Sequence, residues 1–111
     1  MRKRIENYIP KALEVIKELN IANSNGEVSK QFNGYISSFG ASVRQAGLLA
    51  TVLFYANANS NAEKEREKVV TAIEKIINKN IQQNINDKRL KSEVEDAAVA
   101  LKLAIRTFKL I

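Results

Sequence analysis

The side chains that most often carry enzyme chemistry are missing from this sequence. It contains no histidine and no cysteine, so zinc sites, thiol nucleophiles and most general acid–base pairs would lack their usual residues. One carboxylate cluster remains, formed by Glu93, Glu95 and Asp96. At the start of a helix, carboxylates stabilise the positive end of the helix dipole, and the sequence offers them no convergent partner. We therefore expect a protein that is not an enzyme, with no catalytic residue, no metal site and no cofactor.

Basic residues are the more promising group, because Lys and Arg outnumber Asp and Glu by 18 to 12. The net charge of +6 and the isoelectric point near 9.7 favour a polyanionic or acidic partner. On a helix at the end of the chain, Lys91, Lys102, Arg106 and Lys109 would project within one narrow sector. Such a row can neutralise phosphates without reading a base sequence. It can equally be a solvated face that offsets the helix dipole.

Two further groups complete the candidates for contact with a nucleic-acid backbone. Arg2, Lys3 and Arg4 form a cluster at the N-terminus, and Arg44 stands alone beside an apolar segment. Stacking on bases is a weaker prediction, because six of the seven aromatic residues fall on apolar helical faces or in an apolar run. Tyr55 is the aromatic residue least committed to the core. We expect any RNA contact to depend mainly on charge.

Five amphipathic segments must position these side chains. Apolar residues recur every three or four positions, which is the pattern of α-helices with one buried face. Pro10 would kink the first helix or mark its start. Residues 46–56 contain a single polar residue, Thr51, so this helix should lie in the middle of the bundle. The sequence thus predicts an all-α fold, a compact bundle of about five helices with a central apolar helix, in one domain, 1–111. The expected helices cover residues 3–20, 28–39, 42–56, 61–79 and 88–110.

Small and hydroxylated residues mark the expected boundaries. Gly40 interrupts the second helix, and Gly47 suggests close approach of another backbone. Capping boxes are expected at three helix starts, and they pair Ser42 with Gln45, Ser60 with Glu63, and Ser92 with Glu95. The longest apolar run has 11 residues, whereas a membrane span needs about 20. We expect a cytoplasmic protein with no membrane partner and no small-molecule substrate.

Residues 32–56 resemble the signature of a known family, the small helical subunit of the type III-B CRISPR effector, or Cmr RNA-targeting complex. The resemblance lies in Tyr35, a break at Phe39-Gly40, the pair Gly47-Leu48, and Phe54. The final stretch, 96–111, is similar to the C-terminal helix of that family, with Arg106, Phe108 and Lys109 as its basic and aromatic residues. Gly40 stands where the family commonly has proline, and the small subunit of type III-A complexes is the competing family.

The resemblance implies a non-catalytic structural subunit. Such subunits stack as a minor filament beside the subunits that hold the guide RNA, and the two filaments form a basic channel for the guide–target duplex. The expected partners are other effector subunits, copies of this chain, and guide or target RNA. A helical adaptor or oligomerisation module that binds no nucleic acid is the alternative from a different class. Its basic residues would be scattered over the surface or paired with glutamates.

Overall fold

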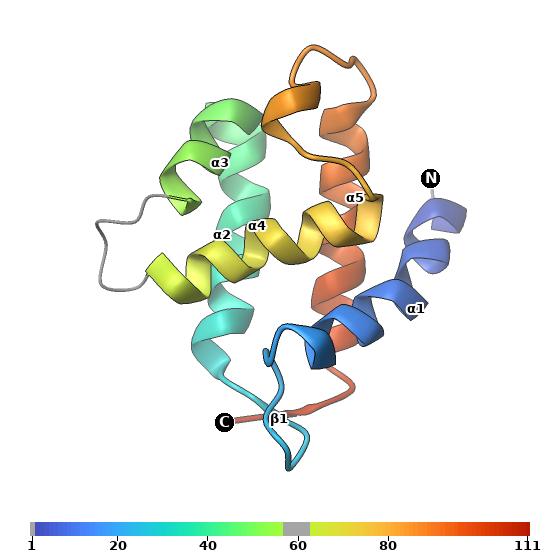
Figure 1. Cartoon of the computed structure of the whole chain (residues 1–111), viewed down its shortest axis with the longest axis vertical. Helices are drawn as coiled ribbons and strands as arrows, with labels where there is room; N and C mark the ends of the chain where they lie inside the picture. Colours follow the sequence, from blue (N-terminus) through green and yellow to red (C-terminus); the bar gives the residue numbers. More distant parts are fainter. Residues whose placement is uncertain (1, 57–62) are drawn as a thin grey trace.

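The computed structural model describes residues 2–56 and 63–111, and helices dominate it (Figure 1). Five α-helices account for most of these residues, which confirms the predicted all-α class and the number of helices. A 3-10 turn, η1 (Gln82–Asn84), lies between the last two helices. The helices are α1 (Arg2–Glu18), α2 (Lys30–Ala46), α3 (Leu48–Tyr55), α4 (Glu63–Ile77) and α5 (Leu90–Ile105).

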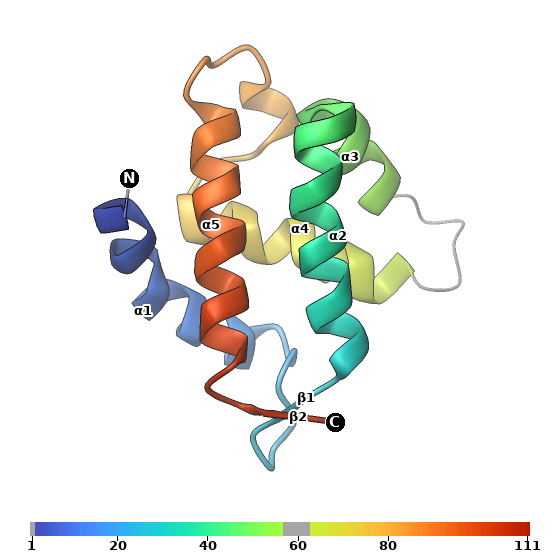
Figure 2. The same ribbon diagram turned by 180° about the vertical axis from the view of Figure 1, so that it is seen from behind.

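The helix at the centre of the bundle is α5. It packs against α1, α2 and α4, and nine of its 16 residues are buried. Figure 1 shows α4 crossing in front of α2 and α5, and Figure 2 shows α2 and α5 side by side from behind, with α1 on the other side of α5. The alanines Ala97, Ala100 and Ala104 are fully buried along α5, and these small side chains let the neighbouring helices pack closely.

The apolar segment predicted to be central lies at the edge instead. Its helix, α3, packs on α2 and α4. Leu49, Leu53 and Phe54 are 44%, 52% and 57% exposed, so one side of α3 faces solvent. The prediction failed because an apolar sequence on every side of a helix does not require a neighbour on every side when the helix has only eight residues. Apolar atoms cover more than half of a typical protein surface.

The break between α2 and α3 falls at Gly47 and not at Gly40. Helix α2 continues through Gly40 and Ser42, so the capping box predicted at Ser42 is wrong. Gly47 has φ +96° and ψ 161°, a backbone conformation essentially restricted to glycine. A Cβ atom there would meet nothing within 4 Å, so Gly47 is needed for its backbone angles and not for a close approach.

Hydroxyl groups hold the corner between α2 and α3. The Oγ1 atom of Thr51 donates to the carbonyl of Gly47 at 2.8 Å. Ser42 Oγ lies 2.7 Å from the same Thr51 oxygen. Because the Thr51 proton is already committed to Gly47, the Ser42 hydroxyl is the donor in the second bond. Thr51 is 1% exposed, and these two bonds satisfy its hydroxyl in the core.

The capping box predicted at Ser92 is also wrong, and the observed helix ends differ from the predicted ones. Helix α5 begins at Leu90 without a side-chain cap, so Ser92 lies inside its first turn and does not cap it with Glu95. Ser60 lies outside the described residues. Helix α1 begins at Arg2 and contains Pro10, which therefore does not mark its start.

The chain beyond α5 is extended and not helical. Strand β2 (Lys109–Leu110) pairs in parallel with β1 (Glu27–Val28). The backbone N–H of Ile111 donates to the carbonyl of Val28 at 2.9 Å. This contact holds the C-terminal residues against the connection between α1 and α2 (Figure 2). Lys109 consequently does not belong to the helical row in which the sequence placed it.

Within the described residues, no helix combines the length and apolar character needed to cross a membrane.

Candidate nucleic-acid interface

A groove of about 550 Å³ lies among residues of α1, α2 and α5. Helix α5 lines it together with residues of α1 and α2. Apolar side chains, among them Ile5, Ala98 and Val99, form part of its wall. Four charged residues also line it: Arg44 from α2, and Glu95, Asp96 and Lys102 from α5. The groove therefore combines an apolar surface with charges of both signs.

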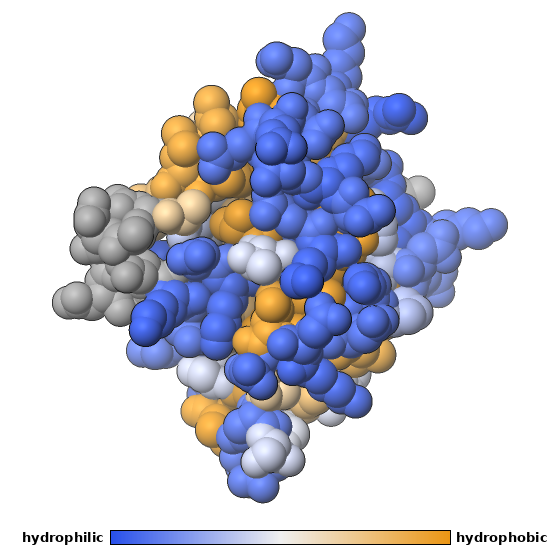
Figure 3. Space-filling model, in the orientation of Figure 1, coloured by the Kyte–Doolittle hydropathy of each residue, from blue (hydrophilic) through white to orange (hydrophobic). Residues whose placement is uncertain are grey.

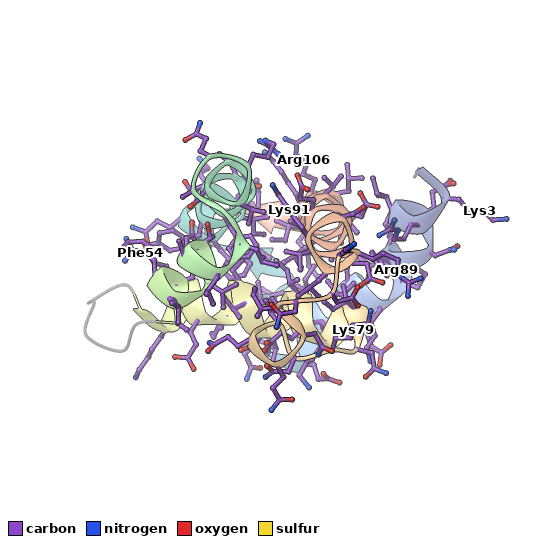
Figure 4. The ribbon with its side chains drawn as sticks, turned by 90° about the horizontal axis from the view of Figure 1, so that it is seen from above. Lys3, Phe54, Lys79, Arg89, Lys91 and Arg106 are labelled. Carbon is purple, nitrogen blue, oxygen red and sulfur yellow. The ribbon has the colours of Figure 1, made fainter. Side chains whose placement is uncertain are left out.

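Two of the predicted basic residues, Arg44 and Lys102, meet in this groove although they come from different helices. The Nζ atom of Lys102 donates to Ser37 Oγ at 2.6 Å, and this bond joins α5 to α2. Lys91 and Arg106 are exposed. Figure 4, seen from above, shows both of them beside α5, on its side toward α2. The fold therefore gathers Arg44, Lys91, Lys102 and Arg106 on one side of the protein.

In the part of the chain that the structure describes, these basic residues have no acidic partner. Among the described residues, no carboxylate lies within ion-pair distance of Arg44, Lys91, Lys102, Arg106 or Lys109. Some cations elsewhere are neutralised locally, as in the pair of Lys75 Nζ with Glu18 Oε1 at 3.3 Å. The distinction matters because a charge without a fixed partner can attract a phosphate without first breaking an ion pair.

The N-terminal residues Lys3 and Arg4 do not form a common basic surface with the four residues above. Arg4 Nε lies 3.3 Å from Asp96 Oδ2, and the Asp96 side chain is almost fully buried. Arg4 thus neutralises a buried carboxylate inside the fold. Lys3 is exposed near the start of α1, far from Lys91 and Arg106 in Figure 4. The side chain of Arg2 lies outside the described residues. Lys109, in β2, is exposed near the C-terminal end of the chain.

The three clustered carboxylates point to different environments and form no common site. Glu93 accepts a hydrogen bond from Lys79 Nζ at 2.8 Å, and Asp87 Oδ2 lies 3.6 Å from the same ammonium. The hydrogen bond from Lys79 to Glu93 raises the pKa of Lys79. Glu95 lines the groove and Asp96 is buried against Arg4. In the described part of the chain, no three residues of the kinds that bind metals are grouped to hold an ion.

Of the neighbouring aromatic residues Phe54 and Tyr55, the tyrosine is buried and the phenylalanine is exposed, the reverse of what the sequence suggested. Tyr55 is 4% exposed, and its hydroxyl donates to the carbonyl of Tyr35 at 3.0 Å. Burial raises the pKa of the Tyr55 hydroxyl. Phe54 is the exposed member, and the Arg66 guanidinium lies 5.1 Å from its ring centre and 5.5 Å from that of Tyr35. Both distances suit cation–π contacts.

An apolar patch on α3, formed by Leu49, Leu53 and Phe54, is the surface feature that sequence reasoning missed. Figure 3 shows apolar side chains gathered over α3 at the upper left. The helix contains no charged residue, which is unusual for an exposed surface. The spacing of Leu49 and Leu53, four residues apart, was a signal that they share one face. Nothing in the sequence indicated that this face would lie outside.

Comparison with known proteins gives one match. A family model described as "CRISPR-associated protein (Cas_Cmr5)" matches residues 4–106, which is nearly the whole chain. No curated protein matches, and no solved structure matches.

Proposed function

The chain belongs to the Cas_Cmr5 family of CRISPR-associated proteins, and from this premise we propose that it is a non-catalytic structural subunit of a type III-B effector complex. In this proposal it acts in the cytoplasm as a single helical domain. It stacks in a minor filament with copies of itself and other subunits. It contacts the backbone of guide or target RNA through its basic surface.

One observation carries the RNA contact: the fold gathers Arg44, Lys91, Lys102 and Arg106 on one side, and no described acidic residue pairs with them. We call these four the basic face. Cations held at fixed separations can neutralise successive phosphates, and this binding is independent of base sequence. Such binding suits a subunit that must accept any guide. Lys109, Lys3 and Arg2 would contribute only if the RNA extends beyond this face.

A matched pair of double variants tests the basic face. Arg44→Gln/Lys102→Gln removes two charges that line the groove, and Lys11→Gln/Lys75→Gln removes two that pair with Glu14 and Glu18. The net charge falls equally in both. For a single strand, two lost phosphate contacts should lower the slope of log affinity against log salt by roughly 1.4. We expect that decrease in the groove variant alone. Equal decreases in both variants would reduce the effect to net charge and contradict the proposal.

The α3 patch favours a protein contact elsewhere on the molecule. Exposed apolar residues without charges are typical of surfaces that another protein covers. We assign this patch to contact with a neighbouring subunit or a second copy. A helical adaptor that binds no nucleic acid would use the same patch. It is the second candidate, and the absence of any salt-dependent RNA binding between about 50 and 200 mM salt would favour it.

A further inference from the structure

Glu95 is out of place in the proposed RNA surface. It lies on α5 one turn after Lys91 and two turns before Lys102, and it lines the groove with Arg44. A carboxylate in that position repels phosphates. Glu95 forms no ion pair or side-chain hydrogen bond with any described residue, and α5 has no side-chain cap. It also lies beyond the first turn of α5, where the helix dipole has little effect. Its spacing of four residues from Lys91 offers at most the weak stabilisation of an exposed helical pair, so the described residues give this carboxylate no fixed partner.

The neighbouring Asp96 is a second carboxylate with an unsatisfied oxygen. Asp96 is 5% exposed and lines the same groove. Its Oδ2 atom is within ion-pair distance of Arg4 Nε, but it accepts no hydrogen bond of good geometry. Buried acceptors are normally satisfied by a donor. The groove thus holds two carboxylates on α5 together with the cations Lys102 of α5 and Arg44 of α2, and among the described residues neither carboxylate accepts a side-chain hydrogen bond of good geometry.

Gly40 keeps the opposite wall of this groove bare. It lies inside α2, where glycine is a poor helix former. Apart from its own helix backbone and chain neighbours, the one described atom within 4 Å of a Cβ placed there would be Nη1 of Arg44, at 3.9 Å. Packing within the chain therefore does not require glycine at this position. Its absence of a side chain leaves room for a ligand beside Arg44 and Lys102.

We propose that the groove holds a ribose of the RNA strand and selects RNA over DNA, with the 2′-hydroxyl donating a hydrogen bond to the Glu95 carboxylate. This inference rests on the proposed function. Arg44 and Lys102 bind the flanking phosphates, which RNA and DNA share. The carbon atoms of the sugar contact Ala98 and Val99. The 2′-hydroxyl is the donor that DNA lacks, so a carboxylate among phosphate-binding cations penalises DNA and is compensated in RNA.

The test compares three labelled strands of one sequence by fluorescence anisotropy: a uridine strand, the corresponding deoxyuridine strand, and a 2′-O-methyl strand. The methylated strand keeps an RNA-like sugar but cannot donate. The unmodified protein should bind the uridine strand most tightly. Glu95→Ala should reduce its preference for that strand by about fivefold, the ratio equivalent to one hydrogen bond of about 1 kcal/mol. Glu67→Ala is the matched control, because Glu67 is an exposed carboxylate on α4.

Separate outcomes identify which proposal fails. If Glu95→Ala tightens binding of all three strands by the same factor, Glu95 merely repels phosphates and the inference is overturned. A uridine strand that binds no better than the methylated strand overturns it as well. In both cases the salt slope of the unmodified protein and its decrease in Arg44→Gln/Lys102→Gln would still support the basic face. If no groove variant changes RNA affinity, the proposed function fails with the inference. Circular dichroism confirms that each variant is folded.

Discussion

The ammonium of Lys102 lies 2.6 Å from the hydroxyl oxygen of Ser37. This hydrogen bond joins the central helix α5 to α2 across the groove, and it places the one half-buried cation of the basic face. A long lysine side chain loses considerable rotamer freedom when it is held in this way. Ser37 therefore limits where a phosphate can meet Lys102.

Replacing Ser37 with alanine separates this positioning effect from charge. Ser37→Ala should lower the free energy of unfolding by about 1 kcal/mol, because Lys102 loses a partly buried acceptor. RNA affinity should change less than in Lys102→Gln, since the positive charge remains. Urea unfolding and RNA titration of the two variants provide the comparison. A larger loss of RNA affinity in Ser37→Ala than in Lys102→Gln would contradict it.

Two glycines should respond to alanine in opposite directions. Gly47→Ala should destabilise the protein by about 1–3 kcal/mol, because the backbone at φ +96° and ψ 161° is strained for any other residue. Gly34→Ala should stabilise it by about 0.5–1 kcal/mol, since Gly34 lies within α2 and a Cβ there meets nothing within 4 Å. Thermal and urea unfolding measure both changes. Destabilisation by Gly34→Ala would show that α2 differs from the structure described.

The α3 patch should govern association and not stability. Leu53→Ser and Phe54→Ser should change the free energy of unfolding by less than about 1 kcal/mol, because both side chains are more than half exposed. Tyr55→Ala, at the adjacent buried position, should cost about 3–5 kcal/mol by analogy with other large aromatic truncations. Sedimentation velocity at increasing concentration should show less self-association in Leu53→Ser than in the unmodified chain. Identical sedimentation would remove α3 from the contact between copies.

Acid should weaken the contacts by which Asp87 holds the start of α5, namely those with the Arg89 backbone N–H and the Lys79 ammonium. A hydrogen bond from the backbone of Arg89, together with the Lys79 ammonium, lowers the pKa of Asp87. A carboxyl whose pKa is lowered by folding stabilises the protein above its unfolded-state pKa, near 3.9. This contribution is lost as the pH falls through the lower, folded-state pKa. Asp87→Asn should therefore show a shallower loss of stability below about pH 4 than the unmodified protein. Parallel urea titrations at pH 6 and pH 3 measure the difference.

At Tyr55 stability should be lost as the pH rises, whereas at Asp87 it is lost as the pH falls. Burial raises the pKa of its hydroxyl above the ordinary value of 10.0. The folded state therefore favours the protonated form, and the resulting stability is present below pH 10 and lost as the pH rises through the folded-state pKa. Tyr55→Phe should remove the part of the loss of stability at alkaline pH that ionisation of this hydroxyl causes. The substitution also removes the hydrogen bond to the Tyr35 carbonyl. Unfolding curves between about pH 8 and 11 bracket the titration.

Periodicity was sufficient to predict the long amphipathic helices, and it placed Lys91, Lys102 and Arg106 on one face. It could not choose between Gly40 and Gly47 as the break, because the choice depends on backbone angles and both glycines follow apolar residues. It also could not orient α3. A rotation of one residue, about 100°, exchanges Phe54 with Tyr55 at the core, and the Tyr35 carbonyl that accepts from the Tyr55 hydroxyl is 20 residues away.

The convergence of Arg44 and Lys102 was likewise beyond the sequence pattern, because the two residues lie on different helices. Each was identified from the sequence as a basic candidate for a phosphate contact, but their common groove depends on how α2 and α5 pack. The pairing of Arg4 with Asp96 has the same origin. Charge can be counted from composition, whereas the cancellation of a charge depends on tertiary contacts.

The parallel pairing of Val28 with Leu110 encloses four of the five helices between its two partners. A contact between such distant residues forms only after the intervening helices have packed, so this short ladder should be a late event in folding. Tension applied to the C-terminus would act first on these few hydrogen bonds and could detach the last residues while the helices stay packed. The C-terminal segment thus behaves as a latch whose release need not disturb the groove between α2 and α5.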